Sequence, residues 1–188
     1  MRVAVVDHGM GNLRSVAKAL EAAGADVAFA GDPRAAEECD GLCVPGQGIF
    51  GRCMEALAGC AFDVLIREWI AAARPYLGIC LGMQVLLDSS EEGSAPGLGV
   101  VPGSVRRLPA GVTVPHIGWN TVGDTYYYFD HSYAAYPEDP AVVAGWTDHG
   151  DRFAAAIRGP ALLGVQFHPE KSGRDGIALL RDWVEDAA

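Results

Sequence analysis

Short apolar segments alternate with amphipathic helical segments over the first 90 residues, and this order limits the fold more than any other feature. The run "RVAVV" (2–6) is typical of a buried strand, and the helical spacing of apolar residues in the next segment ends at Gly24. Strand-like runs recur at 26–30, 41–44 and 75–79, and a helical region at about 50–73 is split near Gly59. This alternation favours parallel strands covered by crossover helices.

The pattern changes beyond Pro96. Short strand candidates separated by Gly, Pro and Asp follow one another, and a final amphipathic helix is expected at about 174–185. No repeat or linker separates the two halves, and 188 residues can bury one core but not two. We therefore predict a single α/β domain over 1–188, with an open, mostly parallel central sheet flanked by helices and additional short antiparallel strands in the C-terminal half.

Charge and hydropathy exclude several classes of partner. The chain has 24 acidic and 14 basic residues, a formal net charge of -10 and no Lys/Arg block that could follow a phosphate backbone. The N-terminal apolar run is interrupted by Asp7, unlike a signal peptide, and no apolar run approaches the roughly 18 residues of a membrane span. We expect a soluble, cytoplasmic protein with neither nucleic acid nor membrane as a partner.

The five cysteines form no recognisable framework. Their number is odd, and they show neither CxxC pairs nor the Cys/His spacing of a zinc site. Neither disulfides nor a bound metal are therefore expected, and four of the cysteines (39, 43, 53 and 60) are interpreted as small buried or half-buried apolar residues.

The fifth cysteine, Cys80, lies in "GICLG" between Gly78 and Gly82, where a strand-like run becomes a helix-like one beginning at Leu81. G-x-C-x-G is the thiol counterpart of the nucleophile elbow, a sharp strand-to-helix turn that needs glycines for close approach. The N–H groups of a helix's first turn favour a thiolate. The alternative is an ordinary core cysteine whose neighbouring glycines serve packing.

A base and an orienting group occur together in "VQFHPEKS". His168 and Glu170 flank Pro169, which favours extended backbone before it, so both side chains can project to one side. With Cys80 they would form a nucleophile, a base and an orienting carboxylate. Taken alone, the tripeptide is more often part of an ordinary loop.

The segment "PGQGIF" follows the strand expected at 41–44. The N–H groups around Gly46, Gln47 and Gly48 can point into a cavity at the carboxyl edge of the sheet, the same edge as the Cys80 turn. Such a loop supplies half of an oxyanion hole, with the Leu81 N–H as the other half. A plain tight turn is the alternative.

Taken together, these motifs resemble the class I, triad-type glutamine amidotransferases, and among them the glutaminase subunits of imidazole glycerol phosphate synthase. "GICLGMQ" and "HPE" mark the broader class, whereas "VPHIGWN" and "HPEKSG" narrow the resemblance to these subunits. It extends over nearly the whole chain through the motifs "DHGMGNLRS", "VPGQGIF", "GICLGMQ", "VPHIGWN", "HSY" and "GVQFHPEKSG".

The resemblance implies that Cys80 attacks the side-chain amide of glutamine to form a thioester, and that no cofactor takes part. Gly46 would also contact the substrate, and Gln84 and the "HSY" loop (His131, Ser132 and Tyr133) would hold the amino and carboxylate ends of glutamine. An ordinary polar strand end is the alternative for that loop. The ammonia would pass to a cyclase subunit with a (β/α)8 barrel in a heterodimer. The residues that would face it are Met10, Asn12, Trp119 and Lys171, although a helix cap, a solvated charge or a core tryptophan could explain three of them.

This chain departs from the family pattern at three places. Gln47 stands where an apolar residue is usual, Asp130 stands where an apolar residue normally precedes the "HSY" loop, and the segment after Trp119 is short. A degenerate family member that acts only as a scaffold would lack part of the triad, and here all three residues are present.

Other functions stay open as alternatives. The glutaminase of another pathway, or a gamma-glutamyl hydrolase, would use the same chemistry but would lack "VPHIGWN". The segment "GMGNLR" begins a dinucleotide-binding G-x-G, but Arg14 occupies the third glycine position.

Overall fold

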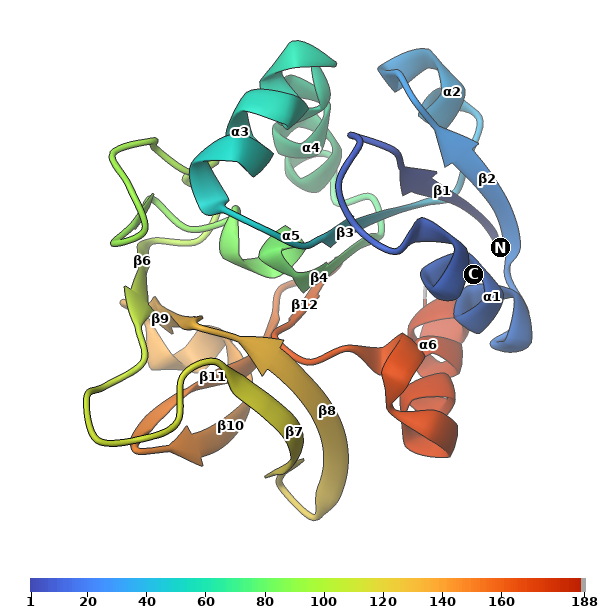
Figure 1. Ribbon diagram of the computed structural model, residues 1–188. Helices are drawn as coiled ribbons and strands as arrows, with labels where there is room; N and C mark the ends of the chain where they lie inside the picture. Colours follow the sequence, from blue (N-terminus) through green and yellow to red (C-terminus); the bar gives the residue numbers. More distant parts are fainter. Residues whose placement is uncertain (187–188) are drawn as a thin grey trace.

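The computed structural model describes residues 1–186, which form a large mixed sheet with helices on both faces and a separate two-stranded sheet (Figure 1). The strands are β1 (Arg2–Val6), β2 (Asp26–Ala30), β3 (Gly41–Gly46), β4 (Tyr76–Cys80), β5 (Ser89–Ser90), β6 (Gly103–Arg107), β7 (His116–Val122), β8 (Thr125–His131), β9 (Tyr133–Pro137), β10 (Val143–His149), β11 (Asp151–Arg158) and β12 (Leu162–Val165). The helices are α1 (Leu13–Ala22), α2 (Pro33–Glu37), α3 (Phe50–Gly59), α4 (Phe62–Ala71), α5 (Leu81–Gln84) and α6 (Gly173–Asp186), with 3-10 turns at Pro140–Val142 and Pro169–Lys171.

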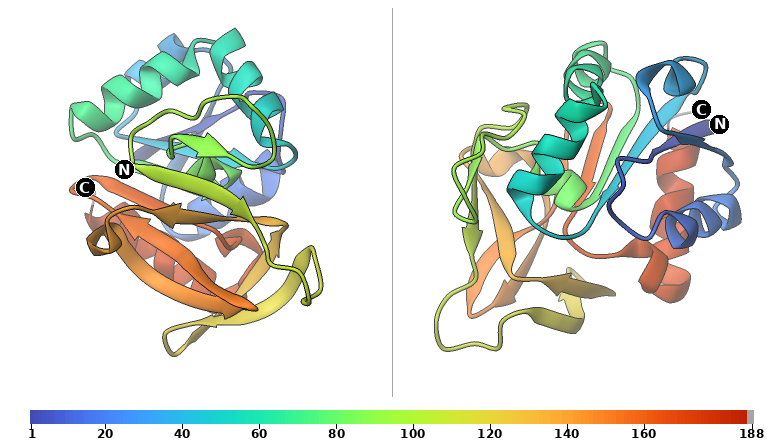
Figure 2. Two further views of the ribbon diagram at one scale, coloured as in Figure 1. Left: turned by 90° about the vertical axis from the view of Figure 1, so that its left-hand side faces the viewer. Right: turned by 45° about the horizontal axis from the view of Figure 1, so that its top comes forward.

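The parallel part of the sheet has the strand order β2-β1-β3-β4-β12. Helices α3 and α4 contribute apolar side chains to the core on one face, and α1 and α6 contribute to the core on the other, as Figures 1 and 2 also show. Both core clusters contain residues from both halves of the chain. The predicted fold class, an open and mostly parallel sheet flanked by helices, is confirmed.

The sheet continues from β12 through antiparallel strands. β11 pairs with β12, β9 and β10, and β6 pairs with β9, so the strands of the C-terminal half extend the same sheet. The hairpin of β7 and β8 forms the second sheet, in which a two-residue turn at 123–124 joins the strands. This turn accounts for the short segment that the sequence shows after Trp119.

Strands β5, β7 and β9 are not evident in the sequence. In β7 the alternation is reversed, because His116 is buried whereas Ile117 and Trp119 are exposed. β9 contains two alanines and ends at a proline, and β5 is two residues long. Such segments become strands through pairing with neighbours rather than through their own propensity.

Local signals set the helix ends close to their predicted positions. Gly24, with φ +100°, follows α1 as expected of a helix stop. The break predicted near Gly59 occurs at Cys60 and Ala61, where Ala61 adopts the left-handed conformation. The helix that begins at Leu81 is only four residues long. Within the described residues no helix is long and apolar enough to cross a membrane.

Candidate active site

Cys80 lies at the sharp turn between β4 and α5, in a conformation that few residues other than glycine adopt. Its φ is +54° and its ψ is -107°. A Cβ atom on Gly78 would overlap the backbone of Gly82, and a Cβ on Gly82 would overlap the Val44 carbonyl oxygen. Gly78 therefore lets the start of α5 fold back onto β4, and Gly82 lets it approach β3. The turn presents the sulfur at the carboxyl edge of the sheet.

His168 and Glu170 occupy the end of the segment after β12 and the 3-10 turn that follows it. His168 Nδ1 donates to Glu170 Oε1 over 2.8 Å, and both side chains are almost fully buried. Burial lowers the pKa of His168, but its hydrogen bonds with Cys80 and Glu170 and their negative charges outweigh this effect and raise the pKa from 6.5 to about 10. The geometry therefore favours an imidazolium between the thiol and the carboxylate.

The loop of Gly46, Gln47 and Gly48 packs directly on the Cys80 turn. A Cβ on Gly46 would come within 2.8 Å of Leu81 Cβ, and Gly48 has φ +104°. Glu92 Oε2 accepts a hydrogen bond of 2.7 Å from the Phe50 N–H, which anchors the start of α3 just after the loop. The start of the loop thus packs against the turn, and its end is held by the hydrogen bond to Glu92.

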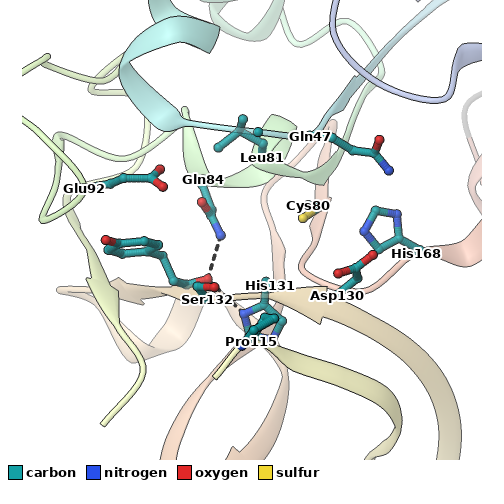
Figure 3. A pocket seen from close by; sticks show the side chains of 12 residues that line it. Gln47, Cys80, Leu81, Gln84, Glu92, Pro115, Asp130, His131, Ser132 and His168 are labelled. Carbon is teal, nitrogen blue, oxygen red and sulfur yellow. Dashed lines mark hydrogen bonds between the residues drawn. The ribbon is translucent and has the colours of Figure 1, made fainter. Parts of the chain in front are cut away.

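A pocket of about 410 Å³ opens over the sulfur (Figure 3). Figure 3 shows Cys80 between Gln84 and His168, and Asp130 also lines the pocket. The structure brings together nine of the predicted catalytic, oxyanion and substrate residues in its wall, while Gly46 and Glu170 border a smaller cavity behind it. The lining residues are Gln47, Gly48, Cys80, Leu81, Gln84, Glu92, Pro115, Asp130, His131, Ser132, Tyr133 and His168.

Three residues of this region were missed by the sequence analysis. Glu92 and Pro115 line the pocket but carry no local signal. Gln166 is fully buried beneath it, and its Nε2 donates to Cys80 Sγ over 3.5 Å. A polar residue within the apolar run "LLGVQF" is the one signal that could have drawn attention to Gln166.

His131 faces the pocket, but both of its ring nitrogens are engaged by the protein. Nδ1 donates to the Tyr133 carbonyl over 2.9 Å, so Nε2 is the acceptor and receives the Nδ1–H of His116 over 3.0 Å. His116 Nε2 in turn accepts from Asn120 Nδ2 over 3.3 Å. Burial lowers the pKa of His131 to about 3 and that of His116 to about 4, so both imidazole rings are neutral at physiological pH. Direct contact of His131 with substrate stays a prediction.

The four residues predicted to face a partner have different environments. Trp119 is 57% exposed, which rules out the core alternative, and Asn12 Oδ1 accepts from the Ser15 N–H and so does cap α1. Lys171 Nζ lies 3.3 Å from Asp130 Oδ2, so it is paired rather than simply solvated. Met10 lies beside Gly48 of the pocket loop.

Comparisons with known proteins identify the family of this chain. The family model described as "Glutamine amidotransferase class-I" matches residues 4–187. Solved structures with the same fold include a glutamine amidotransferase (TM-score 0.79, 21% identity, 98% of both chains) and PurLQS from Thermotoga maritima (TM-score 0.74, 18% identity, 100% of this chain and 99% of that chain). At these identities the structures support the fold alone.

Sequence relatives are much closer than the solved structures. The protein named "Imidazole glycerol phosphate synthase subunit HisH" in Synechococcus sp. (strain JA-2-3B'a(2-13)) is 45% identical, and the match covers 100% of this chain and 94% of the relative. The Aquifex aeolicus protein of the same name is 44% identical, and the match covers 100% of this chain and 98% of the relative. The Halobacterium salinarum protein of that name is 46% identical, covering 99% and 94%. The chain therefore belongs to the class I glutamine amidotransferase family and, within it, to the imidazole glycerol phosphate synthase subunits HisH.

Proposed function

We propose that this chain is the glutaminase subunit of an imidazole glycerol phosphate synthase: it hydrolyses glutamine to glutamate and supplies the ammonia to a cyclase subunit in histidine biosynthesis. Full-length similarity to subunits of that name supports the reaction. The observation that carries the mechanism is the meeting of Cys80, His168 and Glu170, from the ends of β4 and β12, beside one pocket.

In the proposed mechanism, Cys80 Sγ attacks the carboxamide carbon of glutamine, His168 gives a proton to the leaving nitrogen, and ammonia departs. Water, deprotonated by His168, then adds to the thioester carbon; the C–S bond breaks and its electron pair returns to sulfur. Glu170 accepts a hydrogen bond from His168 Nδ1–H, and this bond fixes the imidazole tautomer and stabilises the imidazolium. The N–H groups of Gln47 and Leu81 bind the oxyanion in both steps.

The hydrogen bonds of Gln84 indicate how glutamine is oriented. Both hydrogens of its amide nitrogen are in use, one on the Tyr133 carbonyl at 2.8 Å and one on Gln166 Oε1 at 3.0 Å. Only the acceptor Oε1 is left for the ligand, so we assign Gln84 to the α-ammonium of glutamine rather than to the α-carboxylate. The hydroxyl of Ser132 is the neighbouring donor for the carboxylate, and the negative charge of Asp130 at the pocket wall favours the ammonium group.

The outer face of the β7–β8 hairpin is the proposed docking surface for the cyclase. Ile117, Trp119 and Tyr126 are all more than half exposed, and cross-strand pairing places Tyr128 beside Trp119 on the same face. A contiguous exposed apolar surface marks an interaction site. The Asp130–Lys171 ion pair connects this face to the pocket wall. Ammonia released into water near neutral pH would be protonated, so a docked partner must receive it directly.

Glutamate production by the purified chain, with and without a cyclase subunit and its nucleotide ligand, tests this function. Glutamine turnover that depends on Cys80 and transfer of the amide nitrogen, followed as ¹⁵N, into the cyclase product are expected. Turnover that persists in Cys80→Ala, or a lack of ¹⁵N transfer in the complex, would refute the assignment.

A further inference from the structure

We infer that Gln166 is a further catalytic residue: its side-chain amide donates a hydrogen bond to the Cys80 thiolate and keeps the nucleophile charged beneath the pocket. The inference rests on the proposed function, in which Cys80 is the nucleophile. Gln166 follows β12, and its side chain is 0% exposed. Its own N–H donates to the Ala155 carbonyl over 2.8 Å, so the backbone position of the side chain is firmly held.

The direction of this hydrogen bond is set by a backbone carbonyl, which can only accept. The Tyr133 carbonyl faces the Gln84 side chain at 2.8 Å, so the Gln84 atom that faces it is the nitrogen. The second hydrogen of this NH₂ group points to Gln166 at 3.0 Å, and Gln166 must therefore present its oxygen there. The nitrogen of Gln166 is left to face Cys80 Sγ at 3.5 Å.

The alternative orientation of the Gln166 amide is electrostatically unfavourable at both ends. It would place two NH₂ groups against each other at Gln84 and an amide oxygen against the sulfur. A buried N–H also needs an acceptor, and a neutral thiol is a weak one, whereas a thiolate makes a charge-assisted bond. The buried donor and the ionised sulfur therefore stabilise each other.

The bond matters at two points of the proposed reaction. It is strong while sulfur carries the negative charge before attack on glutamine, and it weakens when the thioester neutralises the sulfur. It strengthens again as the C–S bond breaks and the electron pair returns to sulfur. Gln166 thus favours the resting thiolate and the departure of the thiolate during thioester hydrolysis.

Substitution Gln166→Met tests the inference because methionine has a similar length and no N–H donor. The rate of Cys80 alkylation by iodoacetamide is measured from pH 5.5 to 9.5, with the modified cysteine identified by peptide mapping. We expect alkylation to be about tenfold slower at pH 7, equivalent to about 1.4 kcal/mol, and the midpoint of the pH profile to move to higher pH. With glutamine as substrate, kcat should fall more than KM changes.

A matched control removes a different buried hydrogen bond near the same turn. The Tyr76 hydroxyl donates to the Gly82 carbonyl over 2.8 Å, and its hydrogen bond does not involve the Cys80 sulfur. Tyr76→Phe should therefore keep the parent profile for alkylation of Cys80. An equal shift in Tyr76→Phe and Gln166→Met would mean that the effect is structural, and the inference would be wrong.

A second measurement uses the parent chain and does not depend on how well the variant folds. The side-chain NH₂ of Gln166 is assigned by NMR in ¹⁵N-labelled protein, before and after Cys80 is alkylated with iodoacetamide. Its hydrogen that faces sulfur should move upfield when the thiolate becomes a thioether. No change in that signal, or a parent-like alkylation profile in folded Gln166→Met, would overturn this inference and leave the proposed function standing. Failure of Cys80 to react selectively in the parent would instead overturn the proposed function on which it rests.

Discussion

At the scale of single residues, the conformation of Cys80 is the most demanding feature of the molecule. A non-glycine residue at positive φ costs on the order of 1–3 kcal/mol and persists only where its surroundings enforce it. Here the enforcement is steric, because Gly78 and Gly82 allow backbone contacts that any side chain would prevent. The strain is stored at the residue that we propose as the nucleophile, which must stand clear of the sheet.

The first prediction is that a glutamine-like electrophile labels Cys80 before the other cysteines. Burial and then the charge of Glu170 raise the pKa of Cys43, burial and then the charge of Cys80 raise that of Cys53 to about 12, and burial raises that of Cys39. These three thiols are therefore neutral at pH 7 and poor nucleophiles. Peptide mapping after partial reaction measures the order of labelling.

Cys60 provides the matched control, because it is the partly exposed cysteine of the five and lies outside the pocket. Cys60→Ser should leave the labelling of Cys80 unchanged. Earlier labelling of any other cysteine in the parent chain would contradict the nucleophile assignment.

The second prediction separates the roles of His168 and Glu170. In the proposed mechanism His168 transfers protons in both steps, so His168→Ala should lower kcat by about 1,000-fold or more. Glu170 orients the imidazole through one hydrogen bond, and Glu170→Gln can keep an oxygen there, so more activity should remain. Steady-state glutamate production compares the two variants, and parent-like activity in His168→Ala would disprove the assignment.

At the scale of elements, the β7–β8 hairpin has two different faces. Its outer face carries Trp119, while its inner face buries His116 and His131 among Phe129 and Phe153. His149 of β10 stacks on His116 with ring centroids 4.0 Å apart. Burial lowers the pKa of His116 and of His131, so both imidazoles are neutral at pH 7, and the stability of this face depends on their staying neutral.

The third prediction is that stability falls as pH decreases from 6.5 to 5.0. The folded-state pKa values of His116 and His131, about 4 and about 3, lie below the usual 6.5, so the unfolded chain binds more protons in this range. Each histidine should lower the free energy of unfolding by about 1–2 kcal/mol over this interval. Urea denaturation at the two pH values measures the difference, which should shrink in His116→Gln.

His168 acts in the opposite direction at higher pH. Its folded-state pKa is raised, so its stabilising contribution is complete below about pH 6.5 and is lost as the pH rises toward 10. Confining the comparison to pH 6.5–5.0 separates the two effects. An unchanged pH dependence in His116→Gln would show that the buried hairpin histidines are not its source.

At the scale of the whole molecule, the pocket and the proposed docking face are adjacent. The loop after β3, the turn after β4 and the segment after β12 meet at one sheet edge, because neighbouring parallel strands end on the same side. The hairpin borders the same pocket through Asp130 and His131. A partner docked on the hairpin can therefore influence the loop of Gly46, Gln47 and Gly48.

The fourth prediction is that the isolated chain hydrolyses glutamine slowly and that its cyclase activates it. If the ligand-bound cyclase favours the competent geometry of this loop, a differential stabilisation of about 2.7 kcal/mol gives a 100-fold rise. We expect at least about that increase in steady-state glutamate production. Full activity without a partner would contradict this coupling.

The fifth prediction compares two exposed aromatic residues. Trp119→Ala should weaken cyclase binding by about 2 kcal/mol or more, about 30-fold in Kd, as expected of a central aromatic contact. Phe29 is 52% exposed, close to the 57% of Trp119, but lies on the edge strand β2. Phe29→Ala should leave Kd unchanged in calorimetric titration. Equal effects of the two substitutions would place the interface elsewhere.

The amino-acid sequence by itself determined the parallel layers and the core of the site. The signals that predict these features act between neighbours in the chain, so they can be recognised without knowing the fold. They are the strand and helix periodicities, the glycines around Cys80, and the proline between His168 and Glu170. The single-domain organisation and the roles of the site residues stay predictions. Their positions around one pocket follow from the rule that parallel strands end at a common edge.

Only the tertiary structure decided which other side chains surround the sulfur. Gln166, Glu92 and His116 owe their positions to partners between 15 and 86 residues away in the chain, and the strands β7 and β9 exist through pairing rather than propensity. The orientation of the Gln166 amide is the extreme case. The Tyr133 carbonyl in β9 orients the Gln84 side chain of α5, and Gln84 in turn orients Gln166. A hydrogen-bond direction of this kind is a property of packed atoms, and no local pattern of residues encodes it.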